Sequence, residues 1–112
     1  MMPKKLIQES DHAGFVRAHP MGAVYFSGPN CAVCEALKPK LFDLLQSRFP
    51  ELALAEVDCA ESPRLAGQQS VFTLPTLIVY LDGREGLRKS RGFSLAELAS
   101  ELERPYRIFT DG

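Results

Sequence analysis

Residues 23–34 read AVYFSGPNCAVC, and they join a strand-like run, a turn and two cysteines. The run 23–26 is apolar and rich in residues that favour β-structure, which predicts a buried strand. Residues 27–30 combine Ser, Gly, Pro and Asn, which are typical of a loop. The cysteines follow directly, three positions apart. The segment therefore predicts a strand that leads through a loop to a CxxC motif.

A helix is predicted to begin at the cysteines, because apolar residues recur at helical spacing from Cys31 to about Phe49. Pro39 lies inside this helix and lacks an amide donor, which predicts a kink. At a helix start, Cys31 and Cys34 fall on one face, and their sulfurs can form a reversible disulfide. The helix N-terminus stabilises a thiolate at Cys31. We therefore expect Cys31 to be the attacking nucleophile and Cys34, one turn deeper, to be the resolving thiol.

Two other interpretations explain the CxxC pair less well. A structural disulfide that closes so short a loop contributes only about 2 kcal/mol in the chain-entropy model, in a chain already long enough to fold. A zinc or iron–sulfur site needs further ligands, and the chain offers only Cys59, His12, His19 and scattered carboxylates, without a second CxxC. Cys59 is interpreted as a small buried apolar residue, with a regulatory thiol as the alternative.

The rest of the chain alternates between β-prone and helical segments without internal repeats, which indicates an α/β protein. The patterns predict strands near 4–7, 52–58, 76–81 and 84–92, and helices at 11–19, 62–69 and from Ser94 onward. Asp82-Gly83 predicts a tight hairpin turn between the last two strands. Residues 105–112 are set apart as a C-terminal tail, whose apolar side chains we expect to cover core surface, with contact to a partner as the alternative.

Length and composition are those of one globular domain over residues 1–112. The chain has 112 residues, of which 46% are hydrophobic and 24% charged. A formal net charge of −1 provides no broad attraction for nucleic acid or an anionic membrane, so we expect neither as a partner. The chain start reaches polar residues before a signal-peptide core forms, and no apolar run approaches the roughly 20 residues of a membrane-spanning helix. We therefore expect a cytoplasmic protein.

Taken in order, these motifs resemble the thioredoxin family over nearly the whole chain. The strand before the cysteines, Pro39 in the active-site helix and the strand ending at 57–58 all match the family pattern. Residues 73–76, TLPT, resemble its cis-proline segment, at the usual separation from Cys34. The resemblance implies the thioredoxin fold, a three-layer α/β/α sandwich with a mixed central β-sheet. It also implies a thiol–disulfide oxidoreductase that needs no bound cofactor.

The resemblance further implies a substrate-binding surface around the cysteines. Pro75 would be cis and lie against the CxxC, while the backbone of Leu74 pairs with an extended substrate segment. Asn30 stands just before the first cysteine, where the family commonly has tryptophan, and is placed on the same surface. Gly92, with Phe93, either completes its rim or is only a turn glycine. The implied partners are protein disulfides and an upstream thiol reductase that recharges the pair.

Some residues depart from the family pattern. Tyr25 stands where the family commonly carries a buried acid beneath the cysteines, so a proton acceptor for Cys34 is missing at that position. Glu56 and Glu35 are nearby acids that could assist proton transfer, although surface roles also explain them. The departures leave open a second hypothesis, a thioredoxin-like binding or chaperone module with weak or no general reductase activity. The intact CxxC argues against it, because a pure binding module has no need of two thiols.

Overall fold

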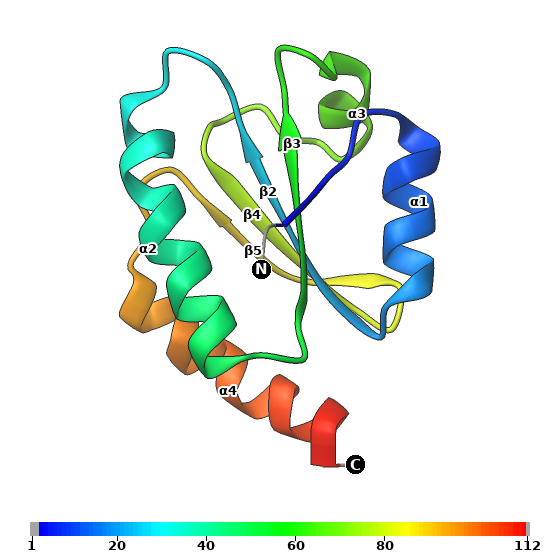
Figure 1. Cartoon of the computed structure of the whole chain (residues 1–112), viewed down its shortest axis with the longest axis vertical. Helices are drawn as coiled ribbons and strands as arrows, with labels where there is room; N and C mark the ends of the chain where they lie inside the picture. The colour runs from blue at the N-terminus through cyan, green and yellow to red at the C-terminus, as the bar shows by residue number, and fades with distance from the viewer. Residues whose placement is uncertain (1–2, 112) are drawn as a thin grey trace.

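A computed structural model describes residues 3–111 of the chain; Met1, Met2 and Gly112, which end the expected domain and tail, lie outside the described residues. Strands and helices alternate along the chain (Figure 1). The elements in order are β1 (Lys4–Lys5), α1 (Glu9–Ala18), β2 (Met21–Ser27), α2 (Ala32–Arg48), β3 (Ala53–Asp58), α3 (Pro63–Gln68), β4 (Thr76–Leu81), β5 (Arg84–Ser90) and α4 (Leu95–Asp111).

The strands form one mixed sheet in the order β1-β3-β2-β4-β5. Strands β1, β3 and β2 run parallel, whereas β4 is antiparallel to both β2 and β5. Tyr25 in β2 lies opposite Glu56 on one side and Leu77 on the other. Strand β2 is therefore a central strand, with a parallel and an antiparallel neighbour.

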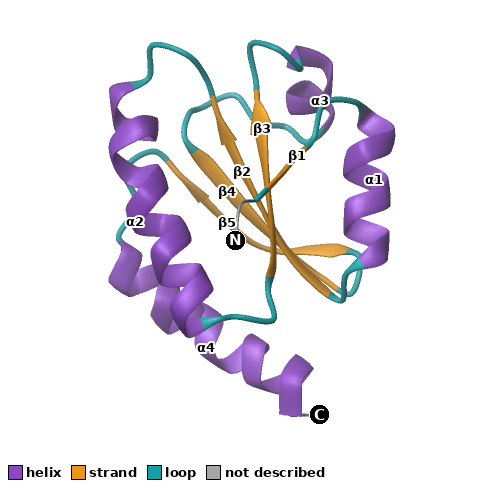
Figure 2. Ribbon diagram, in the orientation of Figure 1, coloured by secondary structure: helices purple, strands orange, loops and turns teal. Residues whose placement is uncertain are grey.

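Helices cover both faces of the sheet, α1 and α3 on one side and α2 and α4 on the other (Figure 2). The α2-side core contains Met21, Ala23, Tyr25, Leu41, Phe42, Leu45, Phe49, Leu52, Leu77, Val79, Leu98, Ala99 and Leu102. The α1-side core contains Leu6, Phe15, Val24, Phe26, Ala55, Val57, Leu65, Ala66, Val71, Ile78 and Tyr80. Successive residues of β2 alternate between the two cores, which explains its nearly continuous apolar run. The predicted three-layer α/β/α sandwich is confirmed.

Helix α1 begins at Glu9, two residues before the predicted start. The carboxylate of Asp11 accepts hydrogen bonds from the amides of Ile7 and Gln8, at 3.2 and 2.9 Å. These amides lie at the helix start and have no partner in the helical ladder. Asp11 thus caps the helix from its third position and does not begin it.

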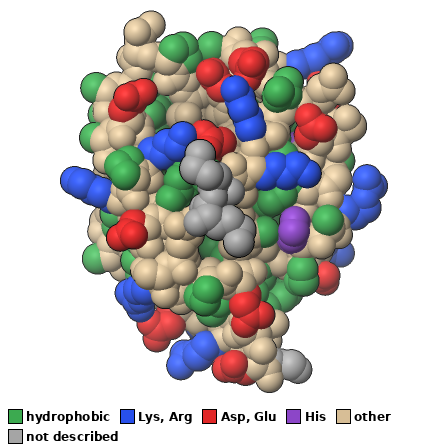
Figure 3. Space-filling model, in the orientation of Figure 1, with side chains coloured by type: hydrophobic (Ala, Val, Ile, Leu, Met, Phe, Trp, Pro, Cys, Tyr) green, Lys and Arg blue, Asp and Glu red, His purple; other side chains and the backbone are tan. Residues whose placement is uncertain are grey.

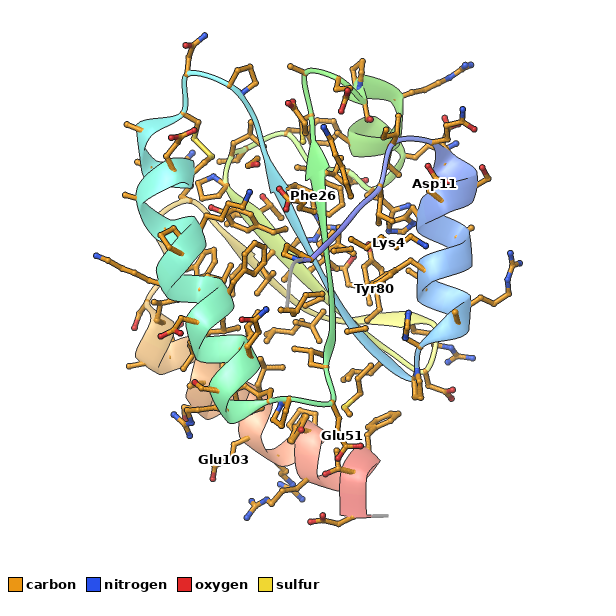
Figure 4. All side chains as sticks on the ribbon, viewed as in Figure 1. Lys4, Asp11, Phe26, Glu51, Tyr80 and Glu103 are labelled. Carbon is orange, nitrogen blue, oxygen red and sulfur yellow. A yellow bond between two sulfur atoms is a disulfide. The ribbon has the colours of Figure 1, made fainter. Side chains whose placement is uncertain are left out.

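The segment set apart as a tail is helical in the structure, because α4 continues through Pro105 to Asp111. Tyr106 packs edge-on against Phe49, with ring centroids 5.1 Å apart. Its hydroxyl also accepts a hydrogen bond from the Glu51 amide at 3.0 Å. The expectation of a separate tail is corrected: these contacts make residues 105–111 the last turns of α4. In Figure 4, Glu51 lies beside these turns.

The sheet brings the predicted site segments to one edge. Strands β2 and β3 are parallel, so their carboxyl ends meet at the top of Figure 1. Strand β4 is antiparallel to β2 and therefore begins at this same edge. The β2–α2 junction with the cysteines and the α3–β4 connection with Pro75 consequently lie together, although they are far apart in sequence.

Among residues 3–111, no helix is both long and apolar enough to cross a membrane. Figure 3 shows basic and acidic side chains interspersed over the face that it displays. That face therefore carries no extended field of one sign, in keeping with the small net charge.

Candidate active site

Cys31 is the N-cap residue of α2 and ends the loop that leaves β2. Its sulfur accepts a hydrogen bond from the Cys34 amide, with an N–S distance of 3.2 Å. The preceding Asn30 has φ of 58°, a left-handed conformation that asparagine tolerates better than most residues. The chain turns at Asn30, and α2 begins directly after Cys31. The amide and the positive end of the helix both favour negative charge on this sulfur once the disulfide is reduced.

Cys31 and Cys34 form a disulfide but differ in exposure. Their Cα atoms are 5.2 Å apart, within the usual range for bridged cysteines. Cys34 is only 2% exposed, whereas Cys31 is partly exposed. Ala32 and Val33 between them are exposed as well. A sulfur of an approaching molecule therefore reaches Cys31 first and Cys34 only through Cys31.

Tyr25 occupies the sheet beneath the first turn of α2. Its side chain is fully buried, and its hydroxyl donates a hydrogen bond of 2.9 Å to the carbonyl oxygen of Cys34. Burial raises the pKa of Tyr25 to about 12. The phenol is consequently neutral near pH 7, so it serves as a hydrogen-bond donor and not as a base.

Glu56 is the carboxylate nearest to this point in the sheet register, since it lies opposite Tyr25. It forms an ion pair with Lys38, whose Nζ is 2.7 Å from the Glu56 Oε1. Sequence reasoning did not single out Lys38, although it stands four positions after Cys34 and thus on the same helix face. The other acid, Glu35, is exposed and lines a shallow hollow beside Asn30 and Cys31.

The Leu74–Pro75 peptide bond is cis, and Leu74 packs against the loop before the cysteines. A Cβ added to Gly28 would lie 3.0 Å from the Leu74 Cδ1, so this loop approaches Leu74 closely because residue 28 is glycine. Within residues 3–111, the amide and carbonyl of Leu74 have no hydrogen-bond partner. Leu74 therefore offers both polar backbone groups beside the CxxC loop.

The turn after β5 also reaches this segment. The Arg91 amide donates a hydrogen bond of 2.7 Å to the Pro75 carbonyl, which places residues 91–93 next to Pro75. The left-handed residue of this turn is Arg91, with φ of 63°. Gly92 is exposed and has open space where a Cβ would stand, so no steric demand for glycine exists there. Phe93 is partly buried and packs against the α2-side core.

Phe72 is an exposed aromatic residue that sequence reasoning did not single out. It is 83% exposed, although its neighbour Val71 is buried in the α1-side core. It lines an apolar cavity of about 300 Å³ together with Cys59, Pro63, Ala66, Gly67, Val71 and Leu74. The sequence feature that could have identified Phe72 is its position as an aromatic residue in the short connection between α3 and β4, just before the segment with Pro75. Leu74 lines this cavity and also approaches the loop at Gly28 that precedes the cysteines.

Cys59 is a free, half-buried thiol outside the disulfide, and its amide donates a hydrogen bond of 2.8 Å to the Ser27 carbonyl at the end of β2. Burial, with Asp58 close by, raises the pKa of Cys59 to about 11, so its thiol is a weak nucleophile at neutral pH. His12 lies on the α1 side of the sheet, hydrogen-bonded to Tyr80 at 2.9 Å. In the described part of the chain, no group of three or more His, Cys, Asp or Glu side chains is placed to hold a metal ion.

Sequence comparison identifies similar proteins. The family model described as Thioredoxin matches residues 4–104. The thioredoxin-like protein YdfQ of Bacillus subtilis (strain 168) is 36% identical over 95 residues, which cover 85% of this chain and 84% of that protein. A thioredoxin of the same organism is 35% identical over 77 residues, covering 69% and 73% of the two chains.

Solved structures show the same architecture. The oxidised form of mitochondrial thioredoxin 3 from Saccharomyces cerevisiae matches with a TM-score of 0.83 at 20% identity, over 91% of this chain and 94% of that one. The thioredoxin of Fasciola hepatica matches with a TM-score of 0.80 at 25% identity, over 90% and 97% of the two chains.

Proposed function

The chain belongs to the thioredoxin family, and from this premise we propose that it reduces disulfide bonds in other proteins. The family and the CxxC disulfide support a thiol–disulfide oxidoreductase in general. The observation that carries the proposal is the unequal pair of cysteines. Cys31 is partly exposed at a helix N-cap that favours a thiolate, and Cys34 is 2% exposed behind it.

The proposed reduction of a substrate disulfide proceeds in two thiol–disulfide exchange steps. In the reduced protein, the Cys31 thiolate attacks a substrate disulfide, and one substrate sulfur leaves as a thiolate that takes up a proton. The Cys34 sulfur then attacks the Cys31 sulfur, so that the Cys31–Cys34 bond forms as the bond to the substrate breaks. The second substrate sulfur leaves and receives the proton that Cys34 lost. Two electrons have passed to the substrate, and an upstream thiol reductase returns two electrons to the pair.

The substrate segment is proposed to lie along Leu74 and Pro75. The partnerless amide and carbonyl of Leu74 support this placement, because an extended chain would satisfy both by β-augmentation. Asn30 borders the same surface beside Cys31, and the turn with Gly92 borders it beyond Pro75. Phe72 would add apolar contact at the outer edge.

A cytoplasmic location is part of the proposal. Reduction of protein disulfides suits a compartment in which thiol reductases keep cysteines reduced. The unpaired Cys59 supports such a compartment, because oxidising conditions select against free thiols.

Insulin reduction tests the proposal, with the wild type, Cys31→Ser and Cys34→Ser compared beside Cys59→Ser as the matched control. We expect Cys31→Ser to abolish turnover, Cys34→Ser to accumulate a mixed disulfide, and Cys59→Ser to behave as the wild type. A titration against glutathione buffers should give a two-electron couple near the roughly −270 mV of thioredoxin. An inert wild type would instead favour the binding or chaperone module, which the absence of an acid at Tyr25 allows.

A further inference from the structure

The hydroxyl of Tyr25 joins the central strand of the sheet to the backbone of Cys34. It donates to the Cys34 carbonyl oxygen at 2.9 Å, and the side chain has no solvent exposure. The ring is fixed from another side by Phe42, edge-on, with centroids 5.7 Å apart. The hydrogen bond therefore starts from a rigid, buried donor and ends on the residue assigned to the resolving step.

Both polar backbone atoms of Cys34 are held by groups on other residues of the site. Its amide donates to the Cys31 sulfur at 3.2 Å, while its carbonyl accepts from Tyr25. Just beyond, Pro39 has no amide to offer to the carbonyl of Glu35, four positions earlier. The first turn of α2 thus has one fewer backbone hydrogen bond to the rest of its helix. The Tyr25 hydrogen bond connects this turn to the sheet instead.

We propose that Tyr25 is a positioning residue for the resolving step, because its hydrogen bond to the Cys34 carbonyl holds the Cys34 sulfur within reach of Cys31. This inference rests on the proposed exchange mechanism. Resolution forms the Cys31–Cys34 bond and breaks the bond between Cys31 and the substrate sulfur. The leaving sulfur takes the electron pair and the proton from Cys34. Tyr25 touches neither sulfur and acts only through the backbone of Cys34.

The two exchange steps depend on this hydrogen bond to different extents. Attack by Cys31 on an external disulfide requires only an accessible thiolate. Resolution is intramolecular, and its rate depends on how well the two sulfurs are held in a reactive geometry. Loss of the Tyr25 hydroxyl should therefore slow the second step and leave the first unchanged.

Tyr25→Phe tests the inference, with Tyr80→Phe as the matched control. Tyr80 is also a buried tyrosine with a hydrogen-bonded hydroxyl, but it faces the α1-side core. Each variant, in a Cys59→Ala background, is reduced and mixed with a limiting amount of a symmetrical nitrobenzoate disulfide. One coloured thiolate is released when Cys31 attacks and a second when Cys34 resolves, so stopped-flow absorbance separates the steps.

In Tyr25→Phe we expect the second release to slow roughly 3- to 10-fold, the effect of one hydrogen bond, with the first release unchanged. Tyr80→Phe should leave both releases at their original rates. A merely structural role would lower stability in urea without changing the ratio of the two rates. Equal slowing of both steps, or an unchanged second step in Tyr25→Phe, would overturn the inference.

A second substitution covers the possibility that Tyr25→Phe does not fold. Fluorotyrosine at position 25 keeps the ring and makes the hydroxyl a stronger donor, so it should speed the second release, and an unchanged rate would contradict the inference. The proposed function fails separately. If the wild type completes both releases but reduces no insulin, the proposal that the protein reduces protein disulfides is wrong. The second-release rates of the wild type and Tyr25→Phe still decide whether Tyr25 is a positioning residue.

Discussion

His12 shows how burial sets the properties of a single residue far from the disulfide. It is 6% exposed, and its ring lies edge-on to Tyr80 with centroids 5.1 Å apart. Figure 4 shows Tyr80 on the side of the sheet that faces α1. Removal from water disfavours the charged imidazolium and lowers the pKa of His12 below its ordinary value of 6.5. The residue is therefore a neutral partner of Tyr80 at neutral pH.

The lowered pKa of His12 predicts a loss of stability in acid. As pH falls below 6.5, the unfolded chain takes up a proton at residue 12 before the folded chain does, so the free energy of unfolding decreases. It stops decreasing once the pH lies below the folded pKa. Urea unfolding across a pH series gives the slope of the free energy of unfolding against pH. This slope should be present in the wild type and flatter in His12→Gln. A slope in His12→Gln equal to that of the wild type would contradict the prediction.

Cys59 is expected to react slowly, although it is the one thiol outside the disulfide in the described chain. Its pKa of about 11, against an ordinary 9.0, lowers the thiolate fraction at pH 7 by roughly 100-fold. In a Cys31→Ser, Cys34→Ser protein, alkylation by iodoacetamide should be slow at pH 7 and much faster after unfolding in urea. Equal rates for the folded and unfolded protein would show that Cys59 is accessible and ordinary.

Among the elements, α4 is attached to the molecule near both of its ends. Lys89 of β5 forms ion pairs with Glu97 and Glu101 in its first half. Near its other end, Tyr106 contacts Phe49 and the amide of Glu51. The exposed Ile108 takes no part in these contacts, since it is 60% accessible. Within the last turns, Tyr106 thus makes the contacts to Phe49 and to the Glu51 amide.

Substitution of Tyr106 should measure that attachment. Tyr106→Phe removes the hydrogen bond to the Glu51 amide and should lower the free energy of unfolding by about 1 kcal/mol. Tyr106→Ala also removes the ring from Phe49 and should cost more, whereas Ile108→Ala should change stability by less than about 0.5 kcal/mol. Urea denaturation gives the values, and insulin reduction should be unaffected. A Tyr106→Ala protein as stable as the wild type would mean that the last turns are detached.

For the whole molecule, the decisive feature is that the central strands β2 and β4 each contribute side chains to both cores. Tyr25 of β2 packs under α2, and its neighbours Val24 and Phe26 pack under α1 and α3. Damage to either core therefore disturbs the strand on which the other is built. We propose on this ground that the chain is a single cooperative domain.

Matched substitutions on the two faces test this cooperativity. Leu45→Ala in the α2-side core and Leu65→Ala in the α1-side core should each lower the free energy of unfolding by about 2–5 kcal/mol. Each should shift one urea transition in which far-UV and near-UV circular dichroism coincide. Val33→Ala, at an exposed site, is the control with little effect. Two separate transitions in either core variant would contradict a single domain.

The sequence by itself determined the α/β class and the helix that starts at the CxxC, because these depend on local patterns, and the order of its motifs determined the family, whose resemblance implied the mixed three-layer fold. Hydrophobic period distinguishes buried strand 23–26 from helix 31–49, and the motif order along the chain identifies the family. It also predicted the alternation of strands and helices. Boundaries were less certain: it did not show that Asp11 caps α1 from within, or that α4 continues through Pro105.

The tertiary structure alone decided which distant groups meet. That Leu74 contacts the loop at Gly28, that Lys38 pairs with Glu56, and that Phe72 lies exposed all depend on strand order and helix placement. The hydrogen bond from Tyr25 to the Cys34 carbonyl depends on how α2 packs over β2. Sequence spacing constrains contacts within one turn or strand, whereas contacts between elements follow from the packing of the whole sheet and its helices.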